Sequence, residues 1–248
     1  MRLGLPDAIR GCLFDLDGVL TNTAAVHAAA WKHMFDEFLR SRAEKSGGSF
    51  VPFSTDSDYD LYVDGRPRAD GTRAFLASRG ITLPEGQPDD PPTAETVHGL
   101  GNRKNALVLD RIAQGGVEVF EGSVRYVHAV RDAGLHRAVV SSSANADEVL
   151  RAAGIRDLFD ALIDGRVGEE RHLAGKPAPD MFLAGAEALA LPPSAAAVFE
   201  DALAGVAAGR AGGFGFVVGV DRVGQAEALR DHGADVVVTD LAQLLERS

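Results

Sequence analysis

Cysteine is almost absent from this chain of 248 residues, and cations are outnumbered by acids. The one cysteine, Cys12, allows no disulfide within the chain and no cysteine-based zinc site. Lys and Arg total 25 against 36 Asp and Glu, and the formal net charge of -11 opposes binding to nucleic acid or to an anionic membrane. No apolar run approaches the roughly eighteen residues of a membrane-spanning helix, and no basic N-terminal region precedes a long apolar stretch. We therefore expect a cytoplasmic protein, and a monomer.

The most informative stretch that is present is Phe14–Leu20, where two carboxylates lie two residues apart. The preceding run, Ile9–Leu16, is short, continuous and apolar, as expected of a strand buried inside a parallel sheet. If the strand stays extended, Asp15 and Asp17 point to the same side, so one could act as nucleophile and the other as proton donor and acceptor. Asp-x-Asp-Gly is also a common turn sequence, with Gly18 marking the turn, so this stretch alone leaves both interpretations open.

Residues 23–113 show no convincing strand pattern and are expected to form an inserted helical cap domain. Large apolar residues recur at helical spacing in Ala24–Arg40. Ser41–Asp58 contains paired glycines, a proline and scattered serines, and is predicted to be a loop or lid. Further helices are predicted at Asp70–Ser78 and Ala94–Ala113.

The remaining residues, 1–22 and 114–248, alternate between strand and helix patterns. This alternation is typical of an α/β core in which a Rossmann-like parallel sheet has helices on both faces. The predicted strands after the first are His136–Ser141, Ala161–Ile163, Ala196–Glu200, Phe214–Val220 and Asp235–Val238. The predicted helices are Ser123–Ala133, Ala146–Ala153, Asp180–Leu189, Leu203–Ala211 and Gln225–His232.

Polar side chains cluster where several of these strands end, which is where such sheets bind ligands. Asp15 ends the first strand, Ser141 ends another, and Glu200 and Asp201 end a third. Three carboxylates on one rim repel one another unless a cation lies between them, and oxygen ligands suit Mg²⁺. The sequence therefore predicts a Mg²⁺ site that includes Asp15, Glu200 and Asp201.

These residue types suit phosphoryl transfer. Asp15 could attack phosphorus, while Asp17 protonates the leaving oxygen and later deprotonates the incoming nucleophile. Lys176, in a loop, could neutralise both Asp15 and the transferring phosphoryl group.

The polar turn Ser141–Asn145 offers hydrogen-bond donors to the phosphoryl group. Ser141 could donate its hydroxyl to a phosphoryl oxygen, and Ser142 and Asn145 are further candidates beside a helix N-terminus. Each polar cluster taken alone could instead be a capping turn or a solvated charge. Four such clusters, in order along the chain at the strand ends, favour an active site.

Together these motifs resemble those of the haloacid dehalogenase superfamily and, within it, the β-phosphoglucomutase group. The resemblance covers nearly the whole chain and implies that Asp15 is the nucleophile. The matching segments are Asp15–Val19, Ser141, Lys176–Asp180 and Glu200–Val206. The implied Mg²⁺ ligands are Asp15, Glu200, Asp201 and the backbone carbonyl of Asp17.

The resemblance extends to the predicted cap. Thr23, His27 and Trp31 follow the first motif at the spacing of the mutase group. Thr23 and Trp31 have an implied role in substrate binding. His27 has an implied role in coupling cap closure to Asp17, because an imidazole can donate a hydrogen bond to a carboxylate or release it near neutral pH. Judged without the resemblance, such a histidine and tryptophan on an apolar helix could simply be packed residues.

Two cap cations are expected to bind the substrate. Gly65–Arg68 resembles the phosphate-binding loop of the mutase cap, and Lys104 falls in a segment that resembles one facing the sugar phosphate. An intermediate with a phosphate at each end needs a cation for the distal phosphate, and Arg68 offers a bidentate guanidinium.

The resemblance implies a Mg²⁺-dependent sugar phosphomutase that interconverts β-D-glucose 1-phosphate and glucose 6-phosphate through an aspartyl phosphate and glucose 1,6-bisphosphate. The alternative is a sugar-phosphate phosphatase of the same fold, in which water takes the phosphoryl group from Asp15. A non-catalytic sugar-phosphate-binding protein is a third interpretation, which the presence of Asp15, Asp17 and Lys176 opposes. In each case the expected partner is a small sugar phosphate.

Overall fold

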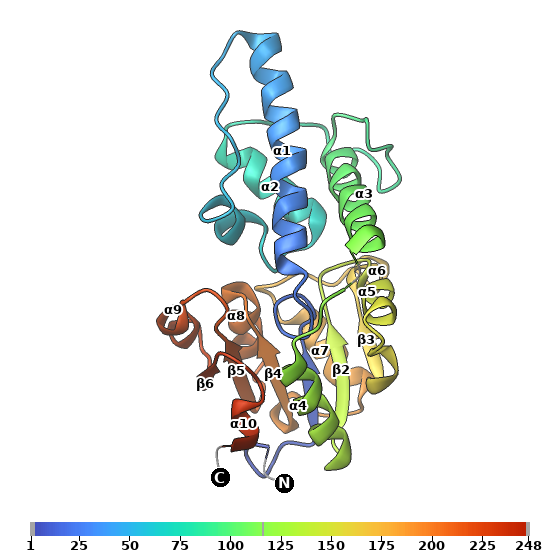
Figure 1. The fold of residues 1–248 in the computed structure, drawn as a ribbon, viewed down its shortest axis with the longest axis vertical. Helices are drawn as coiled ribbons and strands as arrows, with labels where there is room; N and C mark the ends of the chain where they lie inside the picture. The colour runs from blue at the N-terminus through green and yellow to red at the C-terminus, as the bar shows by residue number, and fades with distance from the viewer. Residues whose placement is uncertain (1–2, 116, 247–248) are drawn as a thin grey trace. The chain divides into compact units, whose positions relative to one another are not determined.

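The computed structural model describes residues 3–115 and 117–246, and the chain forms two compact units (Figure 1). The core unit spans Met1–Thr23 and Val117–Ser248, and the cap unit spans Ala24–Gly116. Within the described residues, no helix is long and apolar enough to cross a membrane.

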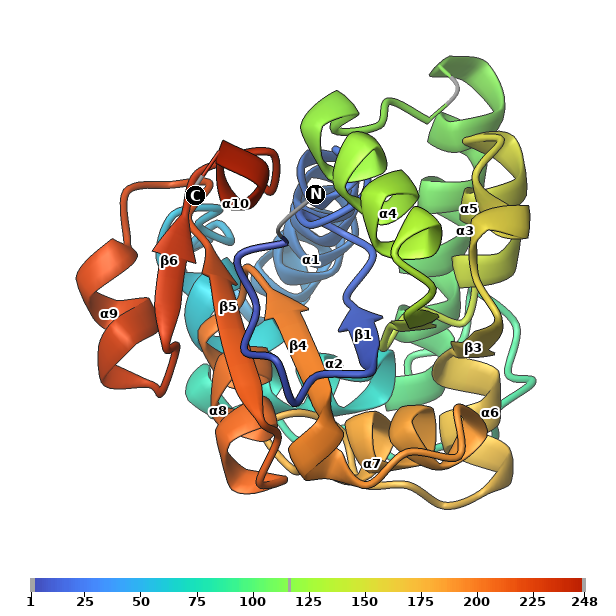
Figure 2. The ribbon, with the colours of Figure 1, turned by 90° about the horizontal axis from the view of Figure 1, so that it is seen from below.

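The core unit is built on a parallel sheet of six strands, in the order β3-β2-β1-β4-β5-β6 (Figure 2). β1 lies in the interior of the sheet, and all four of its residues are buried, which explains its uninterrupted apolar sequence. Its last residue, Phe14, pairs with Val139 of β2 and Phe199 of β4, so these three strands end close together. The strands are β1 (Gly11–Phe14), β2 (His136–Val140), β3 (Ala161–Ile163), β4 (Ala196–Glu200), β5 (Phe216–Val220) and β6 (Val236–Val238).

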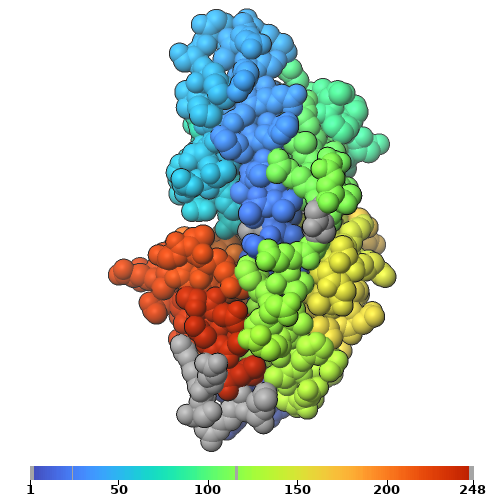
Figure 3. Space-filling model, viewed as in Figure 1, coloured from blue at the N-terminus to red at the C-terminus, as the bar shows by residue number. Residues whose placement is uncertain are grey.

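Helices cover both faces of this sheet. On one face, Leu13 and Val198 belong to an apolar cluster that includes Phe182 of α7 and Val206 of α8. On the other face, Phe14 packs edge-on against Tyr126 of α4, with ring centroids 6.4 Å apart. α4 forms the centre of the core unit's surface in the space-filling view (Figure 3). The helices are α4 (Glu121–Asp132), α5 (Ala146–Ala152), α6 (Gly165–Glu170), α7 (Asp180–Ala188), α8 (Leu203–Ala211), α9 (Ala226–Asp231) and α10 (Gln243–Glu246), with short 3₁₀ turns at Arg156–Leu158 and Pro193–Ala195.

The cap unit is helical and has its own apolar core. Aromatic rings dominate this core: Phe35 lies 4.1 Å from Phe75 and 5.3 Å from Phe53 between ring centroids, and Trp31 stacks on Phe35 at 5.2 Å. Burial of each such ring contributes roughly 1.5–3 kcal/mol. The elements are α1 (Ala24–Ser46), a π-helical turn (Tyr59–Val63), α2 (Arg68–Ser78) and α3 (Val97–Gly115).

The predicted fold class is confirmed: a parallel sheet with helices on both faces carries an inserted helical unit. All the predicted helices and strands are present, and the bounds of all but α1 differ by at most three residues. The elements that the sequence analysis missed are short: α6, α10, the π-helical turn and the two 3₁₀ turns.

The prediction of a loop throughout Ser41–Asp58 is wrong in its first part. α1 continues through Ser46, because the residues after Arg40 are mostly good helix formers. Gly47, with φ of 67°, then ends the helix in the left-handed conformation typical of a helix C-terminus.

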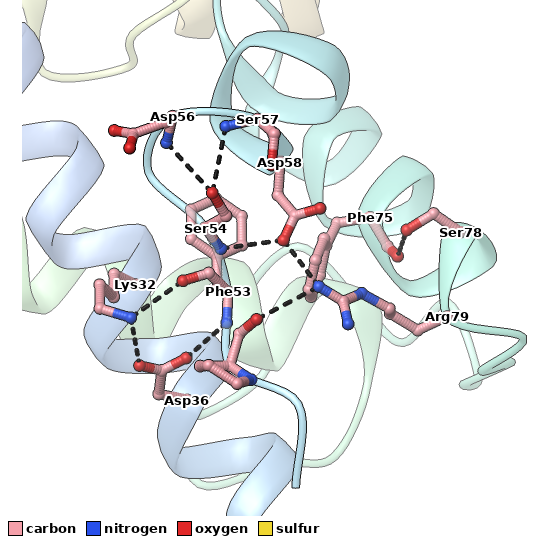
Figure 4. A network of polar contacts seen from close by, with 11 residues as sticks. Lys32, Asp36, Phe53, Ser54, Asp56, Ser57, Asp58, Phe75, Ser78 and Arg79 are labelled. Atoms are coloured by element: carbon pink, nitrogen blue, oxygen red, sulfur yellow. Dashed lines mark hydrogen bonds and ion pairs between the residues drawn. The ribbon is translucent and has the colours of Figure 1, made fainter.

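Side chains of α1 hold the irregular segment that follows (Figure 4). Lys32 Nζ donates to the Phe53 carbonyl at 2.9 Å, and Asp36 Oδ1 accepts the Phe53 N–H at 2.7 Å. Lys32 and Asp36 also pair with each other at 2.8 Å. The backbone of Phe53 is therefore fixed while its ring enters the cap's apolar core.

Candidate active site

β1 delivers Asp15 to the carboxyl edge of the sheet. The Asp15 N–H donates to the Phe199 carbonyl at 2.9 Å, which continues the pairing of β1 with β4 by one residue. Glu200, the last residue of β4, therefore lies beside Asp15. Carboxylate oxygens of Asp15, Glu200 and Asp201 all lie within 4.8 Å of one another, so the predicted convergence of these three residues is observed.

Glu200 is held in place by the start of α8. Its Oε2 accepts the Ala202 N–H at 3.0 Å. A Cβ added at Gly205 would lie 1.8 Å from Oε1 of Glu200, so only glycine leaves room for this carboxylate against the helix.

Lys176 joins two of the carboxylates. Its Nζ donates to Oδ1 of Asp15 and to Oε1 of Glu200, each at 2.5 Å, and it lies 4.9 Å from the ring centroid of Phe182. Burial by itself would lower the pKa of Lys176, but attraction to the two carboxylates outweighs it and leaves that pKa above its ordinary value. Lys176 is thus a permanent cation in this site.

The carboxylate cluster fits a divalent cation. Burial raises the pKa of Asp15 well above its ordinary value, and repulsion from Glu200 and Asp17 adds to the shift while Lys176 opposes it. Lys176 alone does not compensate the negative charge gathered here. Three oxygen donors from Asp15, Glu200 and Asp201 at such spacing are the ligand type that hard cations select.

Asp17 lies in a tight turn rather than in the strand. β1 ends at Phe14 and the chain bends at Leu16, so the extended geometry considered for Asp15 and Asp17 does not form. The Leu16 carbonyl accepts the N–H groups of Leu20 and Thr21. The Asp-x-Asp-Gly sequence therefore does form a turn, and this turn keeps Asp17 near enough to Asp15 for its repulsion to contribute to the raised pKa of Asp15.

Two threonines orient the Asp17 carboxylate. Thr23 Oγ1 donates to Oδ1 of Asp17, and Thr21 Oγ1 lies 2.7 Å from Thr23 Oγ1. Gly18 is required next to Asp17 on two grounds: its φ is 86°, and an added Cβ would lie 1.8 Å from Oδ2 of Asp201. The turn thus packs directly against the third carboxylate.

The polar turn after β2 lies beside these loops. The Ser141 N–H donates to the Ile163 carbonyl at 2.9 Å, and Ser141 Oγ accepts the Ser143 N–H at 3.1 Å. Ser141 and Asn145 are buried and Ser142 is half-buried. Since β2 is the neighbour of β1 in the sheet, this turn follows the strand adjacent to Asp15.

Within the cap unit, the structure brings together three residues that the sequence analysis selected. Lys104 of α3 is buried, and its Nζ lies 2.8 Å from Nδ1 of His27 and 5.0 Å from the ring centroid of Trp31. An ammonium group has only donors, so Nδ1 of His27 accepts this bond and the proton of the neutral imidazole resides on Nε2.

Arg68 packs on the same helix as Lys104. It is the first residue of α2, and a Cβ added at Gly101 of α3 would lie 3.1 Å from its Cγ. Gly101 and Lys104 are three residues apart, so they share a face of α3. The two cap cations therefore lie along one helix face.

The sequence analysis missed one polar cluster, at the end of β5. Arg222 and Gln225 follow this strand and contact the loops that carry Asp17 and Asp201. The rule that selected the other clusters, polar residues directly after a strand, would have found these two as well.

A family model described as haloacid dehalogenase-like hydrolase matches residues 9–213 of the chain. The chain belongs to this family, and it is an enzyme of the α/β class that the resemblance predicted.

The curated relatives and solved structures to which the chain is similar include several β-phosphoglucomutases. The β-phosphoglucomutases of Mycobacterium bovis and Mycobacterium tuberculosis are 59% identical to it over 246 residues, which cover 98% of this chain and 94% of theirs. The β-phosphoglucomutase of Bacillus subtilis is 30% identical over 95% of this chain and 92% of its own. The crystal structure of the Clostridium difficile β-phosphoglucomutase superposes with a TM-score of 0.75, at 26% identity, over 95% of this chain and 93% of that one.

Proposed function

We propose that this enzyme is a β-phosphoglucomutase, which interconverts β-D-glucose 1-phosphate and glucose 6-phosphate. The observation that carries the proposal is the 59% identity with mycobacterial β-phosphoglucomutases over nearly the whole of both chains. The geometry agrees with it, because one buried site combines a candidate nucleophile, a permanent cation and a set of oxygen ligands.

In the first half-reaction, a carboxylate oxygen of Asp15 bonds to phosphorus while the bond from phosphorus to the departing sugar oxygen breaks. Asp17, oriented by Thr23, gives its proton to that oxygen. In the second half-reaction, Asp17 takes the proton of the attacking sugar hydroxyl, and the phosphoryl group leaves Asp15. Lys176 offsets the negative charge around Asp15 throughout.

Mg²⁺ fits these oxygen donors, and Asp15, Glu200, Asp201 and the backbone carbonyl of Asp17 would hold it. When bound, it supplies positive charge that shields the carboxylate nucleophile from the phosphate dianion. Ser141, Ser142 and Asn145 donate hydrogen bonds to the phosphoryl oxygens, which helps to stabilise charge in the transition state.

The cap unit supplies the groups that distinguish a mutase from a phosphatase. Arg68 and Lys104 bind the distal phosphate of glucose 1,6-bisphosphate, and Trp31 lies against the Lys104 ammonium. His27, with its proton on Nε2, is a hydrogen-bond donor for coupling the cap to Asp17. Retention of the bisphosphate by these cations gives its second phosphate time to meet Asp15.

The test supplies β-D-glucose 1-phosphate, Mg²⁺ and trace glucose 1,6-bisphosphate, and follows glucose 6-phosphate and inorganic phosphate together. We expect glucose 6-phosphate with little phosphate release, and loss of the reaction when EDTA removes the metal. Phosphate release without isomerisation would overturn the mutase assignment in favour of a phosphatase.

The clamp role of Arg68 is tested against Arg66, the neighbouring arginine in the same loop. Arg68→Ala is expected to form the aspartyl phosphate but to raise KM for glucose 1,6-bisphosphate by about tenfold or more, as loss of a charged hydrogen-bond pair implies. Arg66→Ala should stay near wild type, because the Arg66 guanidinium donates a long hydrogen bond, of 3.4 Å, to the Leu61 carbonyl of the cap itself. Unchanged mutase activity in Arg68→Ala would refute the clamp.

A further inference from the structure

The loop after β5 is a rigid turn at the edge of the candidate active site. Asp221 Oδ1 accepts three successive backbone N–H groups, from Val223 at 3.2 Å, Gly224 at 2.7 Å and Gln225 at 2.8 Å. A turn closed by three hydrogen bonds to one carboxylate oxygen holds the side chains that it carries, including Arg222, in fixed positions.

Arg222 uses this fixed position to bind the turn that contains Asp17. Its Nε donates to the Gly18 carbonyl at 2.6 Å and a terminal nitrogen reaches the Val19 carbonyl at 3.4 Å. Its other terminal nitrogen donates to the Thr239 carbonyl at 2.8 Å. The guanidinium also stacks on the Phe120 ring, 3.5 Å from its centroid. A planar fork spreads five donors over three nitrogens and can reach carbonyls of separate segments at once, whereas a lysine offers its donors from a single nitrogen.

The Gly18 carbonyl matters because of the peptide that precedes it. The Asp17 carbonyl, one proposed metal ligand, belongs to the same peptide group as the Gly18 N–H, which donates to the Thr21 carbonyl at 2.8 Å. With Arg222 on the Gly18 carbonyl, the backbone of Gly18 is anchored on both sides. The orientation of the Asp17 carbonyl is thereby fixed.

The same loop also binds the other side of the metal site. Gln225 Nε2 donates to the Asp201 carbonyl at 3.0 Å. Burial lowers the pKa of Arg222, and attraction to Asp201 and Asp240 opposes this shift. Because a guanidinium group keeps its proton in proteins, Arg222 is a further cation near the carboxylates.

We infer that Arg222 and Gln225 are positioning residues of the metal site: from one rigid loop, they fix the Asp17–Gly18 peptide and Asp201 at the separation that a divalent cation requires. Both residues act on the site through backbone carbonyls, those of Gly18 and Asp201. The inference rests on the proposed function, which supplies the metal ion, and it adds two residues that lie outside the motifs of the site.

The test compares Arg222→Gln, Arg222→Lys and Gln225→Met with Arg210→Gln in the full chain. Arg210 is a matched control: it also donates to a backbone carbonyl, that of Gly233, at 2.7 Å, and it pairs with Asp235. Binding of Mn²⁺, followed by the electron paramagnetic resonance of the free ion, reports on the site without turnover. The Tm without metal reports on folding.

We expect Arg222→Gln to weaken Mn²⁺ binding about tenfold or more, as for other residues that orient metal ligands. Gln225→Met should weaken it about fivefold, the effect of one lost hydrogen bond. Arg222→Lys, which keeps the charge but loses the fork, should fall between Arg222→Gln and wild type. Arg210→Gln should lower Tm and leave Mn²⁺ affinity within about twofold of wild type.

Equal Mn²⁺ affinity in wild type, Gln225→Met and the Arg222 variants would overturn the inference, whatever their Tm, because the loop would then only stabilise the fold. Gln225→Met decides the matter if the Arg222 variants do not fold. If wild type is an active mutase and the variants bind Mn²⁺ as tightly as wild type does, the inference fails while the proposed function stands. A wild-type chain that neither binds Mn²⁺ nor isomerises the sugar phosphate would overturn both.

Discussion

Lys176 donates a hydrogen bond of 2.5 Å to Asp15 from a loop 161 residues further along the chain, and the two side chains are only 1% and 10% exposed. In a buried ion pair, the attraction between the charges offsets the free energy of removing both from water. Removal of one partner therefore leaves the other as a buried charge without compensation, which is strongly destabilising. Here two carboxylates depend on one ammonium, because Glu200 shares Lys176 with Asp15. The stability of the site is therefore tied to its charge balance.

Replacing this ammonium should destabilise the metal-free enzyme more than the metal-bound enzyme. We expect Lys176→Met to lower the free energy of unfolding by about 3–5 kcal/mol without metal, because Asp15 and Glu200 lose their cation. Added Mg²⁺ should restore part of this loss. Urea unfolding with and without Mg²⁺ measures both effects.

The control for Lys176→Met is Lys45→Met in the cap unit. Lys45 pairs with Glu95 at 2.9 Å, but both side chains are more than half exposed, so its loss should cost less than about 1 kcal/mol and should not respond to Mg²⁺. If Mg²⁺ stabilises Lys176→Met no more than it stabilises wild type, the charge-balance argument is wrong.

Asp15→Asn should separate stability from activity. The amide has the shape of the carboxylate but no charge, so repulsion from Glu200 falls while Lys176 keeps its bond to Glu200. We expect the free energy of unfolding to stay within about 1 kcal/mol of wild type, and kcat to fall by at least about 10⁴-fold, as for other lost nucleophiles.

Beryllium fluoride gives an independent measure of the same variant, because with Mg²⁺ it mimics a phosphorylated aspartate. Wild type should gain thermal stability with both reagents, and Asp15→Asn should not. No shift in wild type would favour a non-catalytic sugar-phosphate-binding protein instead.

The positions of the clustered carboxylates could be predicted because the sheet is buried on both faces. β1 and β4 read as short apolar runs, and the polar residue that interrupts or follows each run lies at its carboxyl end, where parallel strands bring ligand groups together. Asp15 and Glu200 were found in this way. The order of the strands places β1 and β4 side by side. No local pattern in the sequence predicts this order.

The rest could not be predicted for specific physical reasons. The end of α1 at Ser46 lies beyond its apolar stripe, where helix propensity alone gives a weak signal, although Gly47 marks the stop. The partners of Arg222 are backbone carbonyls, which every residue offers, so nothing in the sequence identifies Gly18 as its target. Contacts of side chains with a distant backbone become visible only in the fold.

The half-buried ion pair between Arg79 and Asp58 should stabilise the cap unit (Figure 4). Arg79 donates to Oδ2 of Asp58 at 2.7 Å and stacks on Phe75, while the same carboxylate oxygen accepts the Ser54 N–H. We expect Arg79→Gln to lower the free energy of unfolding of the cap by about 1–3 kcal/mol, because Asp58 loses its charged donor. Hydrogen exchange of the amides of residues 52–58 should accelerate, and mass spectrometry of the corresponding peptide measures it.

Arg73, within α2, is the matched control for Arg79, which directly follows that helix. It pairs with Asp70 at 2.7 Å and with Glu85 at 2.5 Å, but all three side chains are about half exposed. Arg73→Gln should therefore cost less than about 1 kcal/mol and leave exchange in residues 52–58 unchanged. Equal effects of the two substitutions would show that partial burial adds nothing to the Arg79 pair.

Trp31 should report directly on ligand binding at Lys104. It is the single tryptophan of the chain, and the Lys104 ammonium lies 5.0 Å from its ring centroid. A phosphate that binds Lys104 changes the charge next to the indole, so titration with glucose 1,6-bisphosphate should change the fluorescence of wild type. Lys104→Met should weaken the titrated affinity by about tenfold or more, since a charged hydrogen-bond partner of the phosphate is lost.

The neighbouring cation Arg103 controls for a general effect of charge on α3. Its Nε donates to the Pro92 carbonyl at 2.7 Å, so Arg103→Met should leave both the fluorescence change and the affinity near those of wild type. If Arg103→Met and Lys104→Met weaken binding equally, the phosphate responds to the overall charge of the helix. A loss confined to Lys104→Met, by contrast, places the phosphate beside Trp31, because the Lys104 ammonium lies 5.0 Å from the centroid of the indole ring.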